Sequence, residues 1–133
     1  WVTGQKPVEV TAHIDNHGTK VDINSAVAVK LSGGALWTIS VSGNSPGFWE
    51  YHAIAGDKGA LFYLNGDVTF VEGGVKAKGE GFGHYHDQDA GFVKAIRGET
   101  ANEVPGEFGL LVTALTQSTY KSAKLRKPLR ISL

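Results

Sequence analysis

The chain has 133 residues, of which 41% are hydrophobic, which is enough for one domain with a packed core. Thirteen basic and thirteen acidic side chains cancel, so no overall field attracts nucleic acid or an anionic membrane. The absence of cysteine excludes disulfides and thiol chemistry, and no apolar run approaches the roughly 20 residues that span a bilayer. We therefore expect a cytoplasmic globular domain without nucleic-acid or membrane partners. Because the chain begins at Trp1, we also expect it to be a fragment or a processed product.

Short segments with alternating side chains dominate the first 78 residues. Val10, Ala12 and Ile14 alternate with polar residues, which is typical of a half-buried strand. Turn-forming pairs such as Asn65-Gly66 separate the segments, and such short connections favour antiparallel hairpins. The pattern predicts strands over residues 8–14, 21–31, 35–42, 49–55, 60–64, 68–71 and 75–78.

The hydrophobic period becomes helical after residue 86. Phe92, Val93 and Ile96 form one apolar stripe, which predicts a helix over residues 87–97. A longer stripe with spacings of three and four predicts a second helix over residues 107–125, followed by a last strand over 129–133. Strands first and helices last indicate an α+β domain, with an open-faced, mostly antiparallel sheet and helices packed on one face.

Basic side chains gather near the C-terminus. We interpret them as the solvated end of the second helix, where cations interact well with the helix dipole. A nucleic-acid patch is less favoured, because no aromatic residues interleave the later charges. The cluster consists of Lys121, Lys124, Arg126, Lys127 and Arg130.

One face of the sheet is predicted to stay uncovered, because two helices can cover only one face of about seven strands. This face is either the solvated side of an antiparallel sheet or a platform for a ligand, another domain or a second subunit. We expect self-association through it, because small polar and small apolar side chains suit a flat contact between two copies. Alternation assigns to it Thr11, His13, Asp22, Asn24, Thr38 and Ser40, together with Ala26, Ala28 and Leu36.

His84-Tyr85-His86 is the most unusual local cluster. In an extended segment the two imidazoles project to the same side. Three interpretations remain open from the residues alone. They are exposed loop histidines, hydrogen bonding to a polar substrate, and a zinc site completed by Asp87 or Asp89.

Other chemical motifs are weak. Residues 79–83 read Gly-x-Gly-x-Gly, which lacks the Gly-x-Gly-x-x-Gly spacing of a dinucleotide-binding turn. Four aromatic residues could stack on a sugar, although such residues more often pack in a core or on a sheet face. They are Trp1, Trp37, Trp49 and Tyr51.

Several segments match a known pattern when they are taken in chain order. They are residues 20–24 with 31–36, then 54–61, 92–98 with Pro105, and finally 109–123 with 128–131. Their order and spacing resemble the C-terminal domain of the glucose-fructose oxidoreductase/inositol dehydrogenase (Gfo/Idh/MocA) family over nearly the whole chain. Residues 1–4 are similar to the end of the helix that precedes this sheet in the family. Asn24 and Gly33 depart from the acid and the Asn that are usual there.

This resemblance implies that residues 1–133 are a single domain, which stands beside an N-terminal Rossmann domain that this chain lacks. It implies hydride transfer between NAD or NADP and a sugar, cyclitol or similar polyol. The family's dinucleotide glycines and catalytic lysine have no counterpart here, so no catalytic, cofactor-binding or metal residue is assigned. The fragment alone is expected to be inactive and to bind no cofactor.

The resemblance also implies a substrate contact for His84, Tyr85 and His86, because polar and aromatic residues before the late helix approach the substrate in the family. Both His residues stand where Tyr is more usual. Sheet-to-sheet dimers in the family imply a homo-dimer or higher oligomer. Two other hypotheses are a non-catalytic sugar-binding or scaffolding module that uses the same sheet, and a metal-dependent hydrolase that uses His84 and His86.

Overall fold

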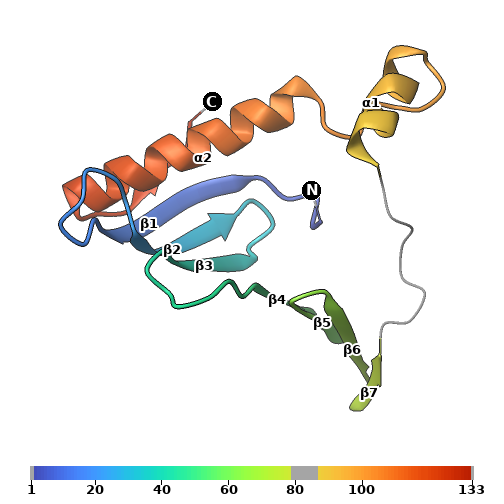
Figure 1. Cartoon of the computed structure of the whole chain (residues 1–133), viewed down its shortest axis with the longest axis horizontal. Helices are drawn as coiled ribbons and strands as arrows, with labels where there is room; N and C mark the ends of the chain where they lie inside the picture. The colour runs from blue at the N-terminus through green and yellow to red at the C-terminus, as the bar shows by residue number, and fades with distance from the viewer. Residues whose placement is uncertain (1, 79–86, 133) are drawn as a thin grey trace. The chain divides into compact units, whose positions relative to one another are not determined.

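The computed structural model describes residues 2–78 and 87–132, which belong to two compact units. Residues 1–45 and 102–133 form the first unit, and residues 46–101 form the second. The described strands form two four-stranded antiparallel sheets, and each unit contributes one helix (Figure 1). These elements confirm the predicted α+β class. Among the described residues, no helix is both long and apolar enough to cross a membrane.

The first sheet joins the two ends of the chain. Its strands lie in the order β3 (Leu36–Ser42), β2 (Asn24–Leu31), β1 (Pro7–Asp15) and β8 (Leu129–Arg130). Every neighbouring pair is antiparallel, and the register between β1 and β2 shifts between residues 7 and 9, as in a β-bulge. The predicted strand over 8–14 is therefore confirmed, whereas the predicted last strand is shorter than expected.

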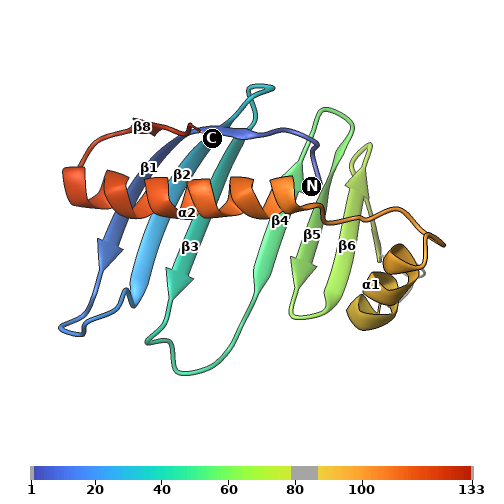
Figure 2. The same ribbon diagram turned by 90° about the horizontal axis from the view of Figure 1, so that it is seen from above.

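The long helix α2 (Gly106–Leu125) packs on one side of this sheet, where it contacts β1 and β8 (Figures 1 and 2). The core lies between them, because alternation along β1 and β2 turns the aliphatic side chains to this side. Leu115 and Ala123 of α2 pack against it. The buried core residues are Val10, Ala12, Val27, Val29 and Leu31.

Ser122 is fully buried and connects α2 to the edge of β1. The short strand β8 pairs only with residues 9 and 10 of β1, so the backbone N–H of Ala12 lies beyond it. That N–H donates to Ser122 Oγ at 3.2 Å, and the Ser122 hydroxyl donates to the Lys127 carbonyl at 2.7 Å. Because a buried unpaired N–H is costly, Ser122 stabilises the edge where the strand partner ends.

The second unit holds the other sheet and the shorter helix. Its strands lie in the order β4 (Tyr51–Ala55), β5 (Gly59–Leu64), β6 (Asp67–Glu72) and β7 (Val75–Lys78), and α1 (Gln88–Ile96) follows in the chain. These bounds agree with the sequence prediction to within one residue, except that β4 begins at residue 51 rather than 49.

The apolar stripe that predicts α1 is exposed. Phe92 and Ile96 keep 68% and 69% of their surface accessible, and no residue of α1 is buried. The periodicity therefore identifies an apolar helix face correctly, but this chain supplies no packed partner for it among the described residues.

The predicted strand over 21–31 begins three residues later than expected. Val21 is exposed and lies in the loop before β2. The Thr19 hydroxyl donates to the backbone carbonyls of Asn16 and Val21, which holds this loop as a turn. Pairing with β1 then runs from Asn24 opposite Asp15. The side-chain hydrogen bonds of the loop thus compete with the sheet ladder and delay the strand.

Candidate functional site

The predicted substrate-contact residues His84, Tyr85 and His86 lie outside the described residues. The described flanks are β7 on one side and the start of α1 on the other. Asp87 is the N-cap of α1, and its Oδ1 accepts hydrogen bonds from the backbone N–H groups of Asp89 at 3.0 Å and Ala90 at 3.2 Å. The helix predicted over residues 87–97 therefore begins with a capping carboxylate at its first predicted residue.

The Asp87 carboxylate limits what the start of α1 can bind. Its Oδ1 already accepts from two of the free N–H groups there, and its negative charge opposes a phosphate at that end of the helix. Within residues 2–78 and 87–132, no group of three His, Cys, Asp or Glu side chains could hold a metal ion. The described residues therefore offer neither a phosphate-binding helix start at α1 nor a metal centre of this kind.

The open face of the first sheet is the side opposite α2. We define it by the strand register, since cross-strand partners share a face. The middle of this face consists mainly of small side chains. In one row, Thr11 lies opposite Ala28, which lies opposite Thr38. In the next row, His13 lies opposite Ala26, which lies opposite Ser40. The complete open face is Glu9, Thr11, His13, Asp15, Asn24, Ala26, Ala28, Lys30, Leu36, Thr38, Ser40, Ser42 and Arg130.

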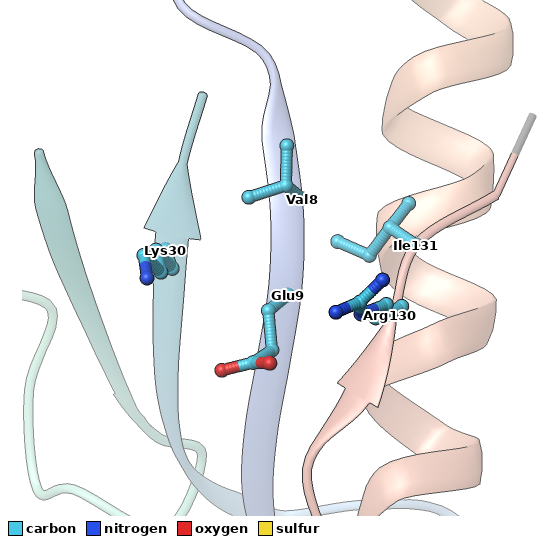
Figure 3. Close-up of a pocket in the computed structure, with 5 residues that line it drawn as sticks. All are labelled: Val8, Glu9, Lys30, Arg130 and Ile131. Atoms are coloured by element: carbon cyan, nitrogen blue, oxygen red, sulfur yellow. The ribbon is translucent and has the colours of Figure 1, made fainter. Parts of the chain in front are cut away.

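One end of the open face carries a row of alternating charges. Glu9 of β1 lies opposite Lys30 of β2 and opposite Arg130 of β8. Figure 3 shows Glu9 between the two cations. Together with Val8 and Ile131, these three residues line a hollow of about 330 Å³. The hollow is open to solvent and lies on a flat strand surface, so it suits contact with another polar surface better than enclosure of a small molecule.

The other end of the open face is polar. Asp15 lies opposite Asn24, which lies opposite Ser42. The Asn24 Oδ1 atom is buried without a hydrogen-bond partner in the described part of the chain. Asp15 accepts the backbone N–H of His17 at 3.2 Å, and the His17 imidazole lies 4.0 Å from its carboxylate.

Asp22 corrects the predicted open face, because it lies in the loop before β2 rather than in the strand. Its Oδ1 accepts a hydrogen bond of 2.9 Å from the Tyr120 hydroxyl on α2. This bond and the negative charge of Asp22 raise the pKa of Tyr120, so the phenol stays protonated as the donor. Tyr120 also lines a hollow of about 370 Å³ with Ile14, Asn16, Ala123 and Lys124.

Among the described residues, Trp37, Trp49 and Tyr51 do not lie in the core, whereas the predicted alternative of packing on a sheet face is confirmed for Tyr51. Trp37 on β3 is 46% exposed and Trp49 is 62% exposed, while Trp1 lies outside the described residues. Tyr51 packs on the sheet face, where its ring stacks on that of Phe62 with centroids 6.5 Å apart. The alternation of side chains along β4 and β5 predicts that Tyr51 and Phe62 can share a face of the sheet. Whether their rings stack depends on the register between the two strands, which the sequence does not give.

A polar cluster that was not predicted from the sequence lies on the opposite side of β4. His52 Nε2 lies 2.7 Å from Glu50 Oε1, and the His52 ring packs against Tyr63 with centroids 5.6 Å apart. Their i, i+2 spacing places Glu50 and His52 on one side of an extended segment, and this spacing was the available signal.

The basic cluster lies where the sequence predicts it. Lys124 is in the last turn of α2, and Arg126 is the C-cap, with a left-handed φ of 53°. The interpretation as a helix end is confirmed for Lys121, Lys124 and Arg126. It is wrong for Arg130, which lies in β8 opposite Glu9.

No protein-family model matches the sequence, and no curated protein matches it either. The similarity to solved structures is extensive. The chain is similar to an oxidoreductase domain protein from Kribbella flavida, with 18% identity and a TM-score of 0.84 over 99% of this chain and 46% of that chain. It is also similar to the aldose-aldose oxidoreductase from Caulobacter crescentus complexed with glycerol, with 17% identity and a TM-score of 0.83 over 98% and 43%.

A third similar structure is the WlbA dehydrogenase from Bordetella pertussis in complex with NADH and UDP-GlcNAcA. Its identity is 20% and its TM-score is 0.72, over 96% of this chain and 41% of that chain. In all three comparisons this chain spans less than half of the other protein. The chain therefore has the fold of a domain that these oxidoreductases share. At the level of the fold, this confirms the resemblance to the C-terminal domain of the glucose-fructose oxidoreductase/inositol dehydrogenase family.

Proposed function

We propose that residues 1–133 work as one C-terminal, substrate-side domain of a cytoplasmic NAD- or NADP-dependent oxidoreductase that acts on a sugar, cyclitol or similar polyol. The observation that carries this proposal is the match of nearly the whole chain to less than half of several oxidoreductases. One of these proteins is in complex with NADH and a nucleotide sugar, and another with glycerol. We assign the dinucleotide to the part of such a protein that this chain does not cover.

The cofactor is assigned to an N-terminal Rossmann domain of the parent chain. This sequence lacks the phosphate-binding Gly-x-Gly-x-x-Gly turn. The starts of both helices also carry acids, Asp87 at the cap of α1 and Glu107 in the first turn of α2. Carboxylates at these positions disfavour a pyrophosphate. When bound in the parent enzyme, the nicotinamide accepts or supplies the hydride, and this domain binds and orients the polyol.

The substrate wall is assigned to His84, Tyr85 and His86. Each of these side chains can donate or accept a hydrogen bond, which suits the hydroxyl groups of a polyol. They precede the capped start of α1, where the Asp87 carboxylate already accepts hydrogen bonds from two of the N-terminal N–H groups. Substrate binding in this segment therefore depends on its side chains rather than on the helix end.

The open face of the first sheet is assigned to self-association. The side chains in its middle are small, as in the cross-strand row of Thr11, Ala28 and Thr38. Leu36 on the same face is 81% exposed, which favours burial against another copy.

Dinucleotide binding should distinguish the 133-residue chain from the full-length protein. We expect isothermal titration calorimetry to detect no binding of NADH or NADPH to the 133-residue chain, because the phosphate-binding turn is missing. The full-length protein should bind one of the two dinucleotides in the low micromolar range. Binding of similar affinity by the 133-residue chain would contradict the assignment of the cofactor to another domain.

A non-catalytic sugar-binding or scaffolding module is the second candidate. It is favoured by the stacked Tyr51 and Phe62 rings, since exposed aromatic faces pack against sugar rings. A full-length protein that binds sugars but reduces no dinucleotide would support this candidate.

A further inference from the structure

Asn65 and Gly66 form the two-residue turn between β5 and β6. The residues on either side, Leu64 and Asp67, pair as the last partners of the two strands. Both turn residues are exposed and have positive φ angles, 47° for Asn65 and 101° for Gly66. An Asn followed by Gly is favoured in such a turn, because both residues tolerate this backbone conformation. Asn65 alone among the asparagines of the sequence precedes a glycine.

The Asn65 side chain is held against the residue that precedes β4. Its Oδ1 accepts a hydrogen bond of 2.7 Å from the backbone N–H of Glu50, and its own backbone N–H donates to the Glu50 carbonyl at 3.0 Å. Because a backbone N–H only donates, the atom that faces it is the side-chain carbonyl oxygen and not the amide nitrogen. The Asn65 amide group therefore has one orientation, and a donor polarises its Cγ–Oδ1 bond.

This arrangement favours attack on the Asn65 side chain by the backbone nitrogen of Gly66. A bond between that nitrogen and the Asn65 Cγ atom closes a small ring, the cyclic imide called succinimide. Negative charge develops on Oδ1 during the attack, so the Glu50 N–H is placed like a donor of an oxyanion hole. Gly66 has no side chain to hinder the approach, and beyond its chain neighbours no described atom lies within 4 Å of the place of a Cβ.

We propose that Asn65 is a site of spontaneous modification, at which the turn converts to a succinimide and then to aspartate or isoaspartate. In the first step the bond from the Gly66 nitrogen to Cγ forms and the bond from Cγ to Nδ2 breaks. The Gly66 nitrogen loses its proton, and Nδ2 leaves with it as ammonia. Water then cleaves one C–N bond of the imide. Cleavage at Cγ gives aspartate, and cleavage at the former peptide carbon gives isoaspartate.

The modification acts on β4 through Glu50 and does not depend on the proposed oxidoreductase function. Isoaspartate adds a methylene to the main chain of the turn, which a two-residue hairpin connection does not accommodate in the same register. Glu50 Oε1 lies 2.7 Å from His52 Nε2, and the His52 ring packs against Tyr63. Loss of the clamp on Glu50 should therefore loosen this polar cluster.

Peptide mapping by mass spectrometry tests the proposal on the folded 133-residue chain during long incubation at mildly alkaline pH. Conversion at Asn65 should exceed that at Asn44 and Asn102 about tenfold or more, because a following side chain hinders the attack and restricts the backbone. These two residues are internal controls. Both are exposed and their Oδ1 atoms also accept hydrogen bonds, but they precede Ser45 and Glu103. Isoaspartate should appear beside aspartate, since the imide opens on both sides.

Two variants of Glu50 test the role of its backbone N–H. Glu50→Ala keeps this donor and Glu50→Pro removes it, so conversion at Asn65 should be about threefold or more slower in Glu50→Pro than in Glu50→Ala. Far-ultraviolet circular dichroism checks that both are folded. If Glu50→Pro does not fold, the wild-type chain in guanidinium chloride replaces it, since unfolding also removes the donor. The folded chain should then convert Asn65 at least as fast as the unfolded chain.

An Asn65 that persists in the folded chain but converts in the unfolded chain would overturn the proposal, because the turn would then protect the side chain. Faster conversion in Glu50→Pro than in Glu50→Ala would overturn it as well, since the Glu50 hydrogen bond would then restrain the amide group instead of activating it. Asn65→Asp is the blank of the mapping and should release no ammonia from this turn.

Discussion

Replacing Ser122 with Ala should lower the free energy of unfolding by about 1–3 kcal/mol, the cost of leaving buried polar groups without partners. The substitution removes both the acceptor of the Ala12 N–H and the donor to the Lys127 carbonyl. Ser122 has 0% of its surface exposed and Ala12 only 3%, so water replaces neither hydrogen bond without local opening. We expect the melting temperature to fall by roughly 3–10 °C in differential scanning calorimetry.

Thr116→Ala is the control for this prediction. Thr116 is an exposed hydroxyl residue on the same helix, and its Oγ1 donates to the Val112 carbonyl. Its removal should change the stability by less than about 0.5 kcal/mol. Equal melting temperatures for the two variants would show that Ser122 does not stabilise the edge of β1.

Replacing His84, Tyr85 or His86 with Ala in the full-length enzyme should impair turnover more than it affects folding. Loss of a hydrogen bond to a substrate hydroxyl should lower kcat/KM about 3- to 10-fold for each residue, and further where the bond strengthens in the transition state. Steady-state kinetics with the true substrate measures this loss, and the melting temperature of each variant should remain close to that of the wild type.

His17→Ala is the matched control for the two histidines. His17 lies in the turn after β1 with its side chain 64% exposed, and it belongs to the other unit. Its removal should leave kcat/KM unchanged. Wild-type kinetics in all three variants of the 84–86 segment would show that the substrate wall lies elsewhere.

Local patterns predict most of the fold, because local forces decide most of it. The alternation around Val10 and Ala12 identifies β1 and its buried side, and the three-and-four spacing identifies α2 almost to the residue. The start of β2 is not predictable in this way. It depends on hydrogen bonds of the Thr19 hydroxyl and on the pairing of Asp22 with Tyr120, which is 98 residues away in the chain.

The role of Ser122 shows a second limit of prediction from sequence patterns. The helical period places it on the apolar stripe, but a hydroxyl on that stripe does not reveal its partner. Ala12 lies 110 residues earlier, and its N–H needs Ser122 only because β8 ends before it. Likewise, Phe92 and Ile96 show that α1 has an apolar face but not what covers it. Hydrophobic periodicity specifies burial and leaves the partner to tertiary structure.

Dinucleotide reduction by the full-length protein tests the central claim most directly. The protein would be incubated with NAD⁺ or NADP⁺ and a panel of sugars, cyclitols and related polyols, and absorbance at 340 nm would be followed. We predict substrate-dependent reduction of one of the two dinucleotides, and none by the 133-residue chain alone. A full-length protein that binds the dinucleotide but transfers no hydride from any polyol in the panel would contradict the proposed function.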